Sequence, residues 1–142
     1  MQTSTVRILL VEDFIPYRTL VISLLGGNPA WQIIGKASDG QEAVEKAQQL
    51  HPDLILLDIA LPKLNGLEAA RRIRGLVPAS KIVFLTQQTS AEFMEEALSL
   101  GAWGYIVKQQ AANDLLEGLT KVLQGKRFVS RGLGGNEFAL DR

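Results

Sequence analysis

The stretch Leu54-Ile55-Leu56-Leu57-Asp58 places one acid directly after four consecutive apolar residues. A run this short and this apolar is typical of a strand that is buried on both faces of a parallel sheet. Three further, mostly apolar runs also end in reactive polar residues: residues 6–11 before Glu12 and Asp13, residues 82–85 before Thr86, and residues 105–107 before Lys108. In an open α/β sheet, ligands bind beyond the carboxyl ends of the strands. We therefore expect these polar side chains to meet in one cleft.

Helix-like stretches separate these runs, and a further strand is expected at residues 31–37. Asp39 can accept hydrogen bonds from free helix amides while Glu42 reaches back, which is the capping-box pattern. The expected helices cover about residues 16–25, 66–76 and 112–123, with two others that open at residues 39–42 and 89–92 and end near residues 50 and 100. Five strands that alternate with five helices predict a doubly wound α/β fold whose parallel sheet is covered on both faces.

The length of the chain suffices for one domain. Of the 142 residues, the domain is expected at residues 1–125, and a glycine-rich tail or linker is expected at residues 126–142.

Charge and hydropathy exclude some classes of function. The formal net charge of zero offers no basic surface for nucleic acid, so direct nucleic-acid binding by this chain is not expected. No apolar run approaches the roughly 20 residues that span a bilayer, and no membrane role is expected. The polar first residues lack a signal-peptide core, so the default expectation is a cytoplasmic location.

The acids at the strand ends predict a metal-dependent phosphoryl site. Two carboxylates about 5 Å apart repel by roughly 3 kcal/mol at an effective dielectric near 20, so Glu12, Asp13 and Asp58 need a cation or a proton. Oxygen ligands with room for water suit Mg²⁺. A carboxylate can attack phosphorus and form an acyl phosphate, and Asp58 is the single acid after the most apolar strand. Thr86 and Lys108 would supply a hydroxyl and a positive charge to the phosphoryl oxygens.

These motifs resemble the receiver domain of two-component response regulators, over residues 6–124. The matching segments are residues 10–13, 56–66, 85–86 and 101–108. The resemblance implies a flavodoxin-like (βα)5 fold with strand order 2-1-3-4-5. It also implies that Asp58 accepts a phosphoryl group from the phosphohistidine of a sensor histidine kinase. Such a domain is a signalling switch that catalyses its own phosphorylation and slow dephosphorylation, and it is not a metabolic enzyme.

The resemblance assigns a role to each motif residue. Glu12, Asp13 and Asp58, together with the backbone carbonyl of Ala60, match the Mg²⁺ ligands of the family. Thr86 and Lys108 match the pair that contacts the phosphoryl group. Tyr105 matches the aromatic residue whose rotamer follows the threonine, and the two form the switch that alters the face made by the fourth helix, fifth strand and fifth helix.

The end of the chain resembles receivers of the NarL/LuxR type, which usually continue into a helix-turn-helix domain that binds DNA. No such domain fits in the remaining residues, so the sequence predicts a stand-alone or truncated receiver without its output domain. A homodimer is a further expectation. Trp103, which lies in a turn between Gly101 and Gly104, is the candidate interface residue, with local packing against the last helix as the alternative.

Two alternatives stay open. Gln87 and Gln109 depart from the family pattern, in which the residue after the threonine is usually small and the residue after the lysine is often proline. Crowding by Gln87 could slow water attack on the acyl phosphate, or could leave a degenerate receiver that acts as a protein-interaction module without phosphorylation. The second alternative is an aspartate-nucleophile phosphatase. Such enzymes commonly carry an acid two residues after the nucleophile, where this chain has Ala60.

Overall fold

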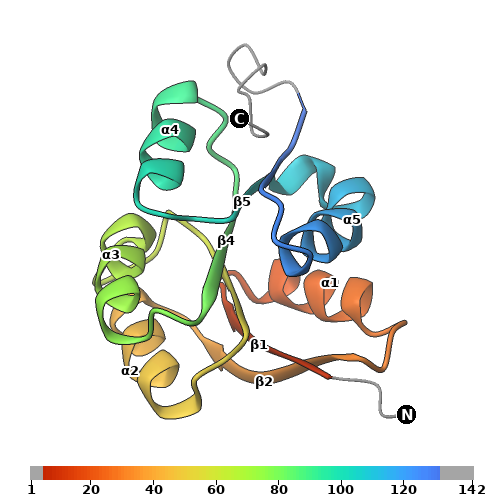
Figure 1. The fold of residues 1–142 in the computed structure, drawn as a ribbon, viewed down its shortest axis with the longest axis horizontal. Coiled ribbons are helices and arrows are strands. Elements are labelled where there is room, and N and C mark those ends of the chain that lie inside the picture. The colour runs from red at the N-terminus through yellow and green to blue at the C-terminus, as the bar shows by residue number, and fades with distance from the viewer. Residues whose placement is uncertain (1–4, 132–142) are drawn as a thin grey trace.

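The apolar runs form neighbouring strands of one parallel sheet (Figure 1). The computed structural model describes residues 5–131. Its strands are β1 (Val6–Val11), β2 (Trp31–Ala37), β3 (Leu54–Leu57), β4 (Lys81–Thr86), β5 (Gly104–Val107) and β6 (Phe128–Val129). Its α-helices are α1 (Ile15–Leu25), α2 (Gly40–Leu50), α3 (Gly66–Leu76), α4 (Ala91–Ser99) and α5 (Ala111–Leu123), and a 3-10 turn, Lys108–Gln110, precedes α5.

The strand order is β2-β1-β3-β4-β5-β6, and all neighbouring strands are parallel. The expected flavodoxin-like order 2-1-3-4-5 is thereby confirmed, with one strand added at the end. The register aligns the carboxyl ends of the strands. Leu57 pairs with Val11 on one side and with Phe84 on the other, so the residues that follow β1 and β3 emerge side by side.

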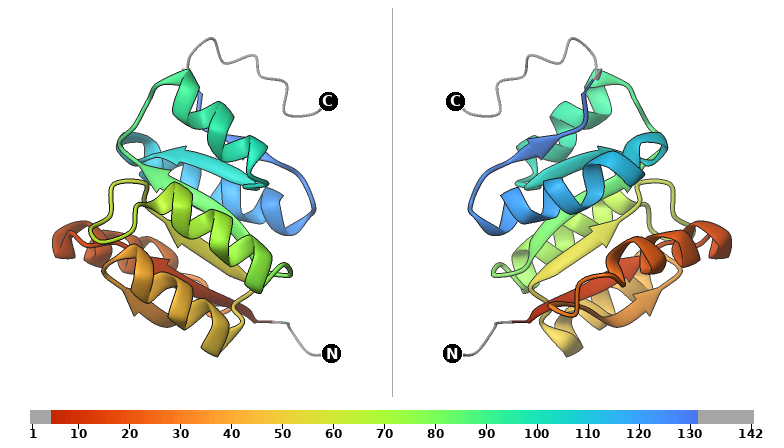
Figure 2. Two further views of the ribbon diagram at one scale, coloured as in Figure 1. Left: turned by 90° about the vertical axis from the view of Figure 1, so that its left-hand side faces the viewer. Right: turned by 90° about the vertical axis from the view of Figure 1, so that its right-hand side faces the viewer.

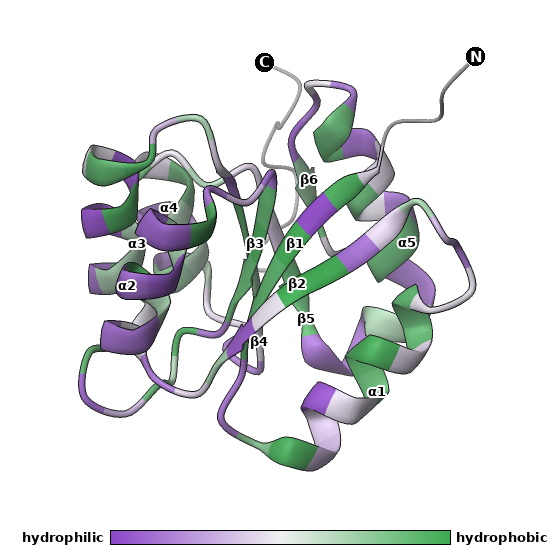
Figure 3. Cartoon of the chain, turned by 90° about the horizontal axis from the view of Figure 1, so that it is seen from below, coloured by the Kyte–Doolittle hydropathy of each residue, from purple (hydrophilic) through white to green (hydrophobic). Residues whose placement is uncertain are grey.

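Helices cover both faces of the sheet, as expected (Figure 2). α2, α3 and α4 lie on one face, and α1 and α5 lie on the other. Successive residues of a strand point to opposite faces: Ile55 and Leu57 of β3 join the core under α2–α4, whereas Leu54 and Leu56 join the core under α1 and α5. The strand is therefore apolar at every position, whereas α2 and α3 carry both polar and apolar residues (Figure 3).

Side-chain caps begin three of the helices. Asp39 Oδ1 accepts a hydrogen bond from the Glu42 amide at 2.7 Å, and Glu42 Oε1 accepts one from the Ser38 amide at 2.8 Å. The capping box predicted at residues 39–42 is confirmed, with Glu42 reaching one residue further back than the cap itself. Asn65 and Ser90 cap α3 and α4 in the same way, because each accepts from the amide three residues ahead.

The structure differs from the sequence expectation at β6. The composition predicts a tail from residue 126 onward, yet Phe128 donates to the Trp103 carbonyl at 3.1 Å and Ser130 donates to the Tyr105 carbonyl at 3.0 Å. The physical reason lies in α5: a Cβ on Gly118 would meet the Phe128 ring at 2.7 Å, so this glycine makes room for the ring. The remainder of the expected tail, residues 132–142, lies outside the described residues.

No helix among residues 5–131 is both long and apolar enough to cross a membrane.

Replacing Ser130 with alanine should destabilise the domain. Ser130 is 1% exposed, and its Oγ accepts a hydrogen bond from the Val107 amide at 3.1 Å. Ser130→Ala leaves that buried amide without its acceptor, which should lower the free energy of unfolding by about 1–3 kcal/mol. Urea unfolding followed by circular dichroism measures the change. Ser99→Ala is the matched control, because the Ser99 hydroxyl lies on the exposed end of α4 and its loss should cost less than about 0.5 kcal/mol. Equal stability of Ser130→Ala and the parent chain would contradict the prediction.

Candidate functional site

Three acids from two strand ends meet at the carboxyl edge of the sheet. Glu12 and Asp13 follow β1, and Asp58 follows β3. One carboxylate oxygen from each of the three lies within 4.8 Å of the others. Glu12 and Asp58 are 2% and 5% exposed, whereas Asp13 is exposed. The structure thus brings together the three acids that the sequence singles out, with an open side at Asp13.

Lys108 crosses from the end of β5 to this cluster. Its Nζ lies 2.7 Å from Glu12 Oε1 and 3.0 Å from Asp58 Oδ2, and its side chain is 9% exposed. Short contacts between an ammonium and carboxylates are charge-assisted hydrogen bonds, which are stronger than neutral ones. Lys108 therefore offsets part of the repulsion between the two buried acids.

Burial and pairing act together on the ionisation of these groups. Burial raises the pKa of Glu12, although hydrogen bonds from Lys108 and from the Phe14 amide, the latter at 3.0 Å, oppose the rise. Burial alone would lower the pKa of Lys108, but its hydrogen bonds to Glu12 and Asp58 outweigh this effect, and the pKa of Lys108 is raised. The ammonium is therefore held in its charged form beside the acids.

The donor set of this cluster fits a hard divalent cation. The three clustered acids offer carboxylate oxygens and no nitrogen or sulfur ligand, and the exposed carboxylate of Asp13 leaves space for water. Mg²⁺ prefers such oxygen ligands and usually keeps several waters. Ala60 lies next to the cluster, since its amide is 3.4 Å from Asp58 Oδ1.

The loop between β3 and α3 fixes the position of Asp58. The Asp58 amide donates to the Val11 carbonyl at 3.3 Å, and the Gly66 amide donates to the Ile59 carbonyl at 2.8 Å. A Cβ on Gly66 would lie 1.9 Å from the Asp58 carbonyl oxygen, so the start of α3 packs against the backbone of the acid. Only glycine fits this approach without a shift of the loop.

Thr86 and Tyr105 are linked through one backbone residue. Both are fully buried, Thr86 at the end of β4 and Tyr105 in β5. Thr86 Oγ1 accepts from the Gln88 amide at 3.2 Å, and the Tyr105 hydroxyl donates to the Gln88 carbonyl at 2.9 Å. Burial and the charge of Asp58 raise the pKa of Tyr105, so the hydroxyl stays protonated and can donate. The loop before α4 is therefore hydrogen-bonded to both Thr86 and Tyr105, while the Gln87 side chain, between Thr86 and Gln88, is exposed.

Trp103 packs locally. Its indole is partly buried, with Lys81 Nζ 4.5 Å and the Arg127 guanidinium carbon 5.6 Å from the ring centroid. Its ring packs against the core under α1 and α5, which fits the local-packing alternative. Its role in association stays a prediction.

Two residues of α1 join the site without any signal in the sequence motifs. The Tyr17 hydroxyl donates to the Lys108 carbonyl at 3.0 Å, and the Tyr17 ring centroid lies 4.6 Å from Lys108 Nζ. Arg18 donates to the Glu12 carbonyl at 2.9 Å and to the Ser38 hydroxyl at 2.7 Å. Because an aromatic or basic residue in the first turn of a helix is ordinary, only the contacts themselves mark these two.

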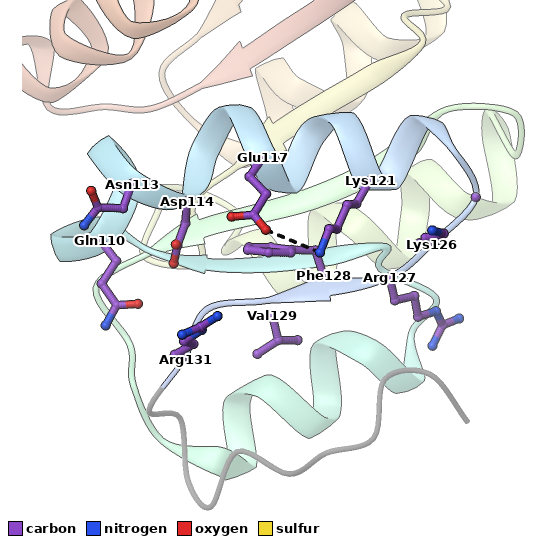
Figure 4. Close-up of a pocket in the computed structure, with 11 residues that line it drawn as sticks. Gln110, Asn113, Asp114, Glu117, Lys121, Lys126, Arg127, Phe128, Val129 and Arg131 are labelled. Carbon is purple, nitrogen blue, oxygen red and sulfur yellow. Dashed lines mark ion pairs between the residues drawn. The ribbon is translucent and has the colours of Figure 1, made fainter.

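A separate cleft of about 1080 Å³ lies between α5 and β6. An ion pair between Lys121 and Glu117, 3.3 Å long, crosses its wall, and Phe128 and Arg131 line it from the β6 side (Figure 4). None of the site residues predicted from the sequence lines this cleft. The acidic cluster and the cleft are therefore different places on the molecule.

Comparison with known proteins identifies the family. Residues 8–120 match the model of the response regulator receiver domain. The nitrate/nitrite response regulator protein NarL of Escherichia coli K12 is 36% identical over 89% of this chain and 58% of its own length. The response regulator GacA of Pseudomonas viridiflava is 32% identical over 88% of this chain and 58% of its own length. The chain thus spans little more than half the length of these curated relatives.

A solved structure agrees in both fold and sequence. The crystal structure of a LuxR-family two-component response regulator from Aurantimonas sp. SI85-9A1 superposes with a TM-score of 0.88 at 30% identity, covering 93% of this chain and 94% of that one. The shared fold and the family match agree with the resemblance seen in the sequence motifs. This chain belongs to the response regulator receiver domain family, and within it to the NarL/LuxR type.

Proposed function

We propose that this chain is a phosphorylation-dependent switch whose phosphoryl acceptor is Asp58. One observation carries the proposal: Lys108 Nζ lies within 3.0 Å of both Glu12 and Asp58, inside a cluster of three carboxylates at the strand ends. This arrangement combines a nucleophilic carboxylate with positive charge for phosphoryl oxygens. A purely structural ion pair would not need the third, exposed acid, Asp13.

In the proposed reaction, a carboxylate oxygen of Asp58 attacks the phosphorus of a sensor kinase phosphohistidine. The new O–P bond forms as the N–P bond breaks, and the imidazole nitrogen keeps the electron pair and takes a proton. Mg²⁺ held by Glu12, Asp13, Asp58 and the Ala60 carbonyl would neutralise charge on the phosphoryl oxygens. Lys108 would move from the carboxylates to a phosphoryl oxygen, and the buried position of Asp58 limits the access of water.

The switch would act through Gln88, whose backbone is hydrogen-bonded to both Thr86 and Tyr105. A phosphoryl oxygen on Asp58 would draw the Thr86 hydroxyl away from the Gln88 amide. The Tyr105 hydroxyl, which donates to the carbonyl of the same residue, would then follow the loop. Two arrangements of one packed loop form the kind of bistable element that a local charge can bias. The face formed by α4, β5 and α5 would carry the change to a partner.

The partners are part of the proposal. A sensor histidine kinase would donate the phosphoryl group, and a second copy of the chain or a DNA-binding output domain in a longer native chain would receive the signal. This chain matches 58% of the length of NarL and 52% of that of a transcriptional regulatory protein, DegU of Brevibacillus brevis. A cytoplasmic location and a role for Trp103 in association are further parts of the proposal.

Intact mass measured with acetyl phosphate and Mg²⁺ tests the function. The parent chain should gain the mass of one phosphoryl group, and Asp58→Asn should gain none, because an amide lacks the nucleophilic oxygen. Asp53→Asn is the matched control, since Asp53 lies at the opposite end of β3, where its carboxylate accepts from the Arg7 amide. This control should be phosphorylated like the parent.

The same experiment separates the alternatives. A parent chain that gains no phosphoryl group and does not bind beryllium fluoride would favour the degenerate receiver and overturn the proposal. Multiple turnover of phosphate esters would favour the phosphatase.

Gly66→Ala should slow phosphorylation at least tenfold, because small misplacements of a reacting group can cost as much as about a hundredfold. The added Cβ would overlap the Asp58 carbonyl oxygen and displace the acid. Gly75→Ala, in the same helix, is the control. Its added Cβ would have nothing within 4 Å, so its phosphorylation rate should equal that of the parent chain. Initial rates with acetyl phosphate provide the measurement. Similar rates for both variants would show that the close approach at Gly66 does not position Asp58.

Gln87→Ala tests the departure next to Thr86. If the exposed Gln87 side chain restricts water at the site, the alanine variant should lose its phosphoryl group faster than the parent. The decay of phosphorylated protein after removal of the donor measures this lifetime. Equal lifetimes would refute a shielding role for Gln87.

A further inference from the structure

We propose that Tyr17 is a positioning residue for Lys108. Its ring would hold the Lys108 ammonium near the acids, and its hydroxyl would fix the position of the Lys108 backbone. This inference rests on the proposed function, because it concerns the same site. Tyr17 lies in the first turn of α1, in the part of the chain that directly follows the acids Glu12 and Asp13.

Tyr17 contacts Lys108 at both ends of the lysine. The Tyr17 hydroxyl donates to the Lys108 carbonyl at 3.0 Å, and the centroid of the same ring lies 4.6 Å from Lys108 Nζ. A cation within about 6 Å of an aromatic face is attracted by the ring. One side chain therefore holds the backbone of Lys108 and also provides a surface for its charged group.

The ring and the acids are complementary partners of the ammonium. Lys108 Nζ is hydrogen-bonded to Glu12 and Asp58, and the aromatic face provides a further contact. Tyr17 itself is partly buried against the core formed by α1, α5 and the sheet. Burial, followed by the charges of Glu12 and Asp58, raises the pKa of Tyr17 to about 12, so its hydroxyl remains a donor at neutral pH.

This contact matters when Lys108 changes partners. Transfer of the ammonium from the carboxylates to a phosphoryl oxygen breaks its hydrogen bonds to Glu12 and Asp58. The hydrogen bond from Tyr17 to the Lys108 carbonyl does not involve the ammonium and can persist through that change. The backbone at the start of the 3-10 turn would thus stay fixed while the Lys108 side chain moves. Tyr17 of α1 would in this way determine which positions the ammonium can occupy.

Two variants separate the ring from the hydroxyl. Tyr17→Leu removes both contacts but keeps an apolar side chain, and Tyr17→Phe removes only the hydrogen bond. Phe128→Leu is the matched control, because Phe128 is also a partly buried ring of the same core, and the lysine beneath it is Lys121 rather than Lys108. Circular dichroism establishes that each variant is folded.

The first measurement needs neither metal nor phosphodonor. Acetylation of Lys108 by N-hydroxysuccinimidyl acetate, followed by peptide mass spectrometry, reports how firmly the ammonium is held. Tyr17→Leu should raise the acetylation rate by about three- to tenfold, the size expected for loss of a partly desolvated cation–π contact. Tyr17→Phe should give a smaller rise, and Phe128→Leu should match the parent chain.

The second measurement asks whether Tyr17 acts through Lys108. Initial phosphorylation by acetyl phosphate should be slower in Tyr17→Leu, and slower to a lesser degree in Tyr17→Phe. In a Lys108→Ala background, neither change at Tyr17 should slow it further, because a residue that acts through another has no effect once that one is removed.

Each outcome decides the inference. Equal Lys108 acetylation in the parent and both Tyr17 variants would overturn it, and so would a Tyr17 effect that persists undiminished without Lys108. If Tyr17→Leu does not fold, Tyr17→Phe decides by the same two criteria. If the parent chain takes up no phosphoryl group, the proposed function fails, while acetylation still tests the contact between Tyr17 and Lys108.

Discussion

The shared ammonium of Lys108 is the interaction on which the carboxyl edge of the sheet depends. Two acids that are at most 5% exposed emerge from adjacent strands, and at an effective dielectric near 20 two such charges about 5 Å apart repel by roughly 3 kcal/mol. Lys108 contacts both at hydrogen-bonding distance from a third strand. The electrostatic constraint therefore spans β1, β3 and β5, and it leaves Asp13 as the acid that faces solvent.

The same constraint supports the proposed switch. A phosphoryl group on Asp58 would add negative charge where the ammonium already contacts two carboxylates, so Lys108 would have to exchange its partners. Lys108 directly follows β5, the strand that contains Tyr105 and whose Val107 amide is bound to Ser130. Lys108 therefore connects the acids directly to β5. This strand is in turn bonded to the loop before α4, through the Tyr105 hydroxyl, and to β6.

Most of this arrangement could be predicted from the sequence because its signals are local. Buried parallel strands are apolar at nearly every position, so β1, β3, β4 and β5 stand out as short runs, and the polar residue after each run marks the site edge. Helix caps are equally local: Asp39 and Glu42 lie three residues apart and satisfy amides within the same turn. The strand order came from the resemblance to receivers, since periodicity identifies strands without ordering them.

What the sequence did not predict depends on contacts between distant segments. β6 has two residues, too few for a detectable pattern, and it is placed by a ring that fits over Gly118. Tyr17 meets Lys108 across 91 positions of sequence, because α1 and α5 share one face of the sheet. A tyrosine in the first turn of a helix fits core packing equally well, so its role is visible only from its partners. Residues that supply charge at strand ends are therefore identifiable from type and position, whereas residues that hold those charges in place are identifiable only from the packed fold.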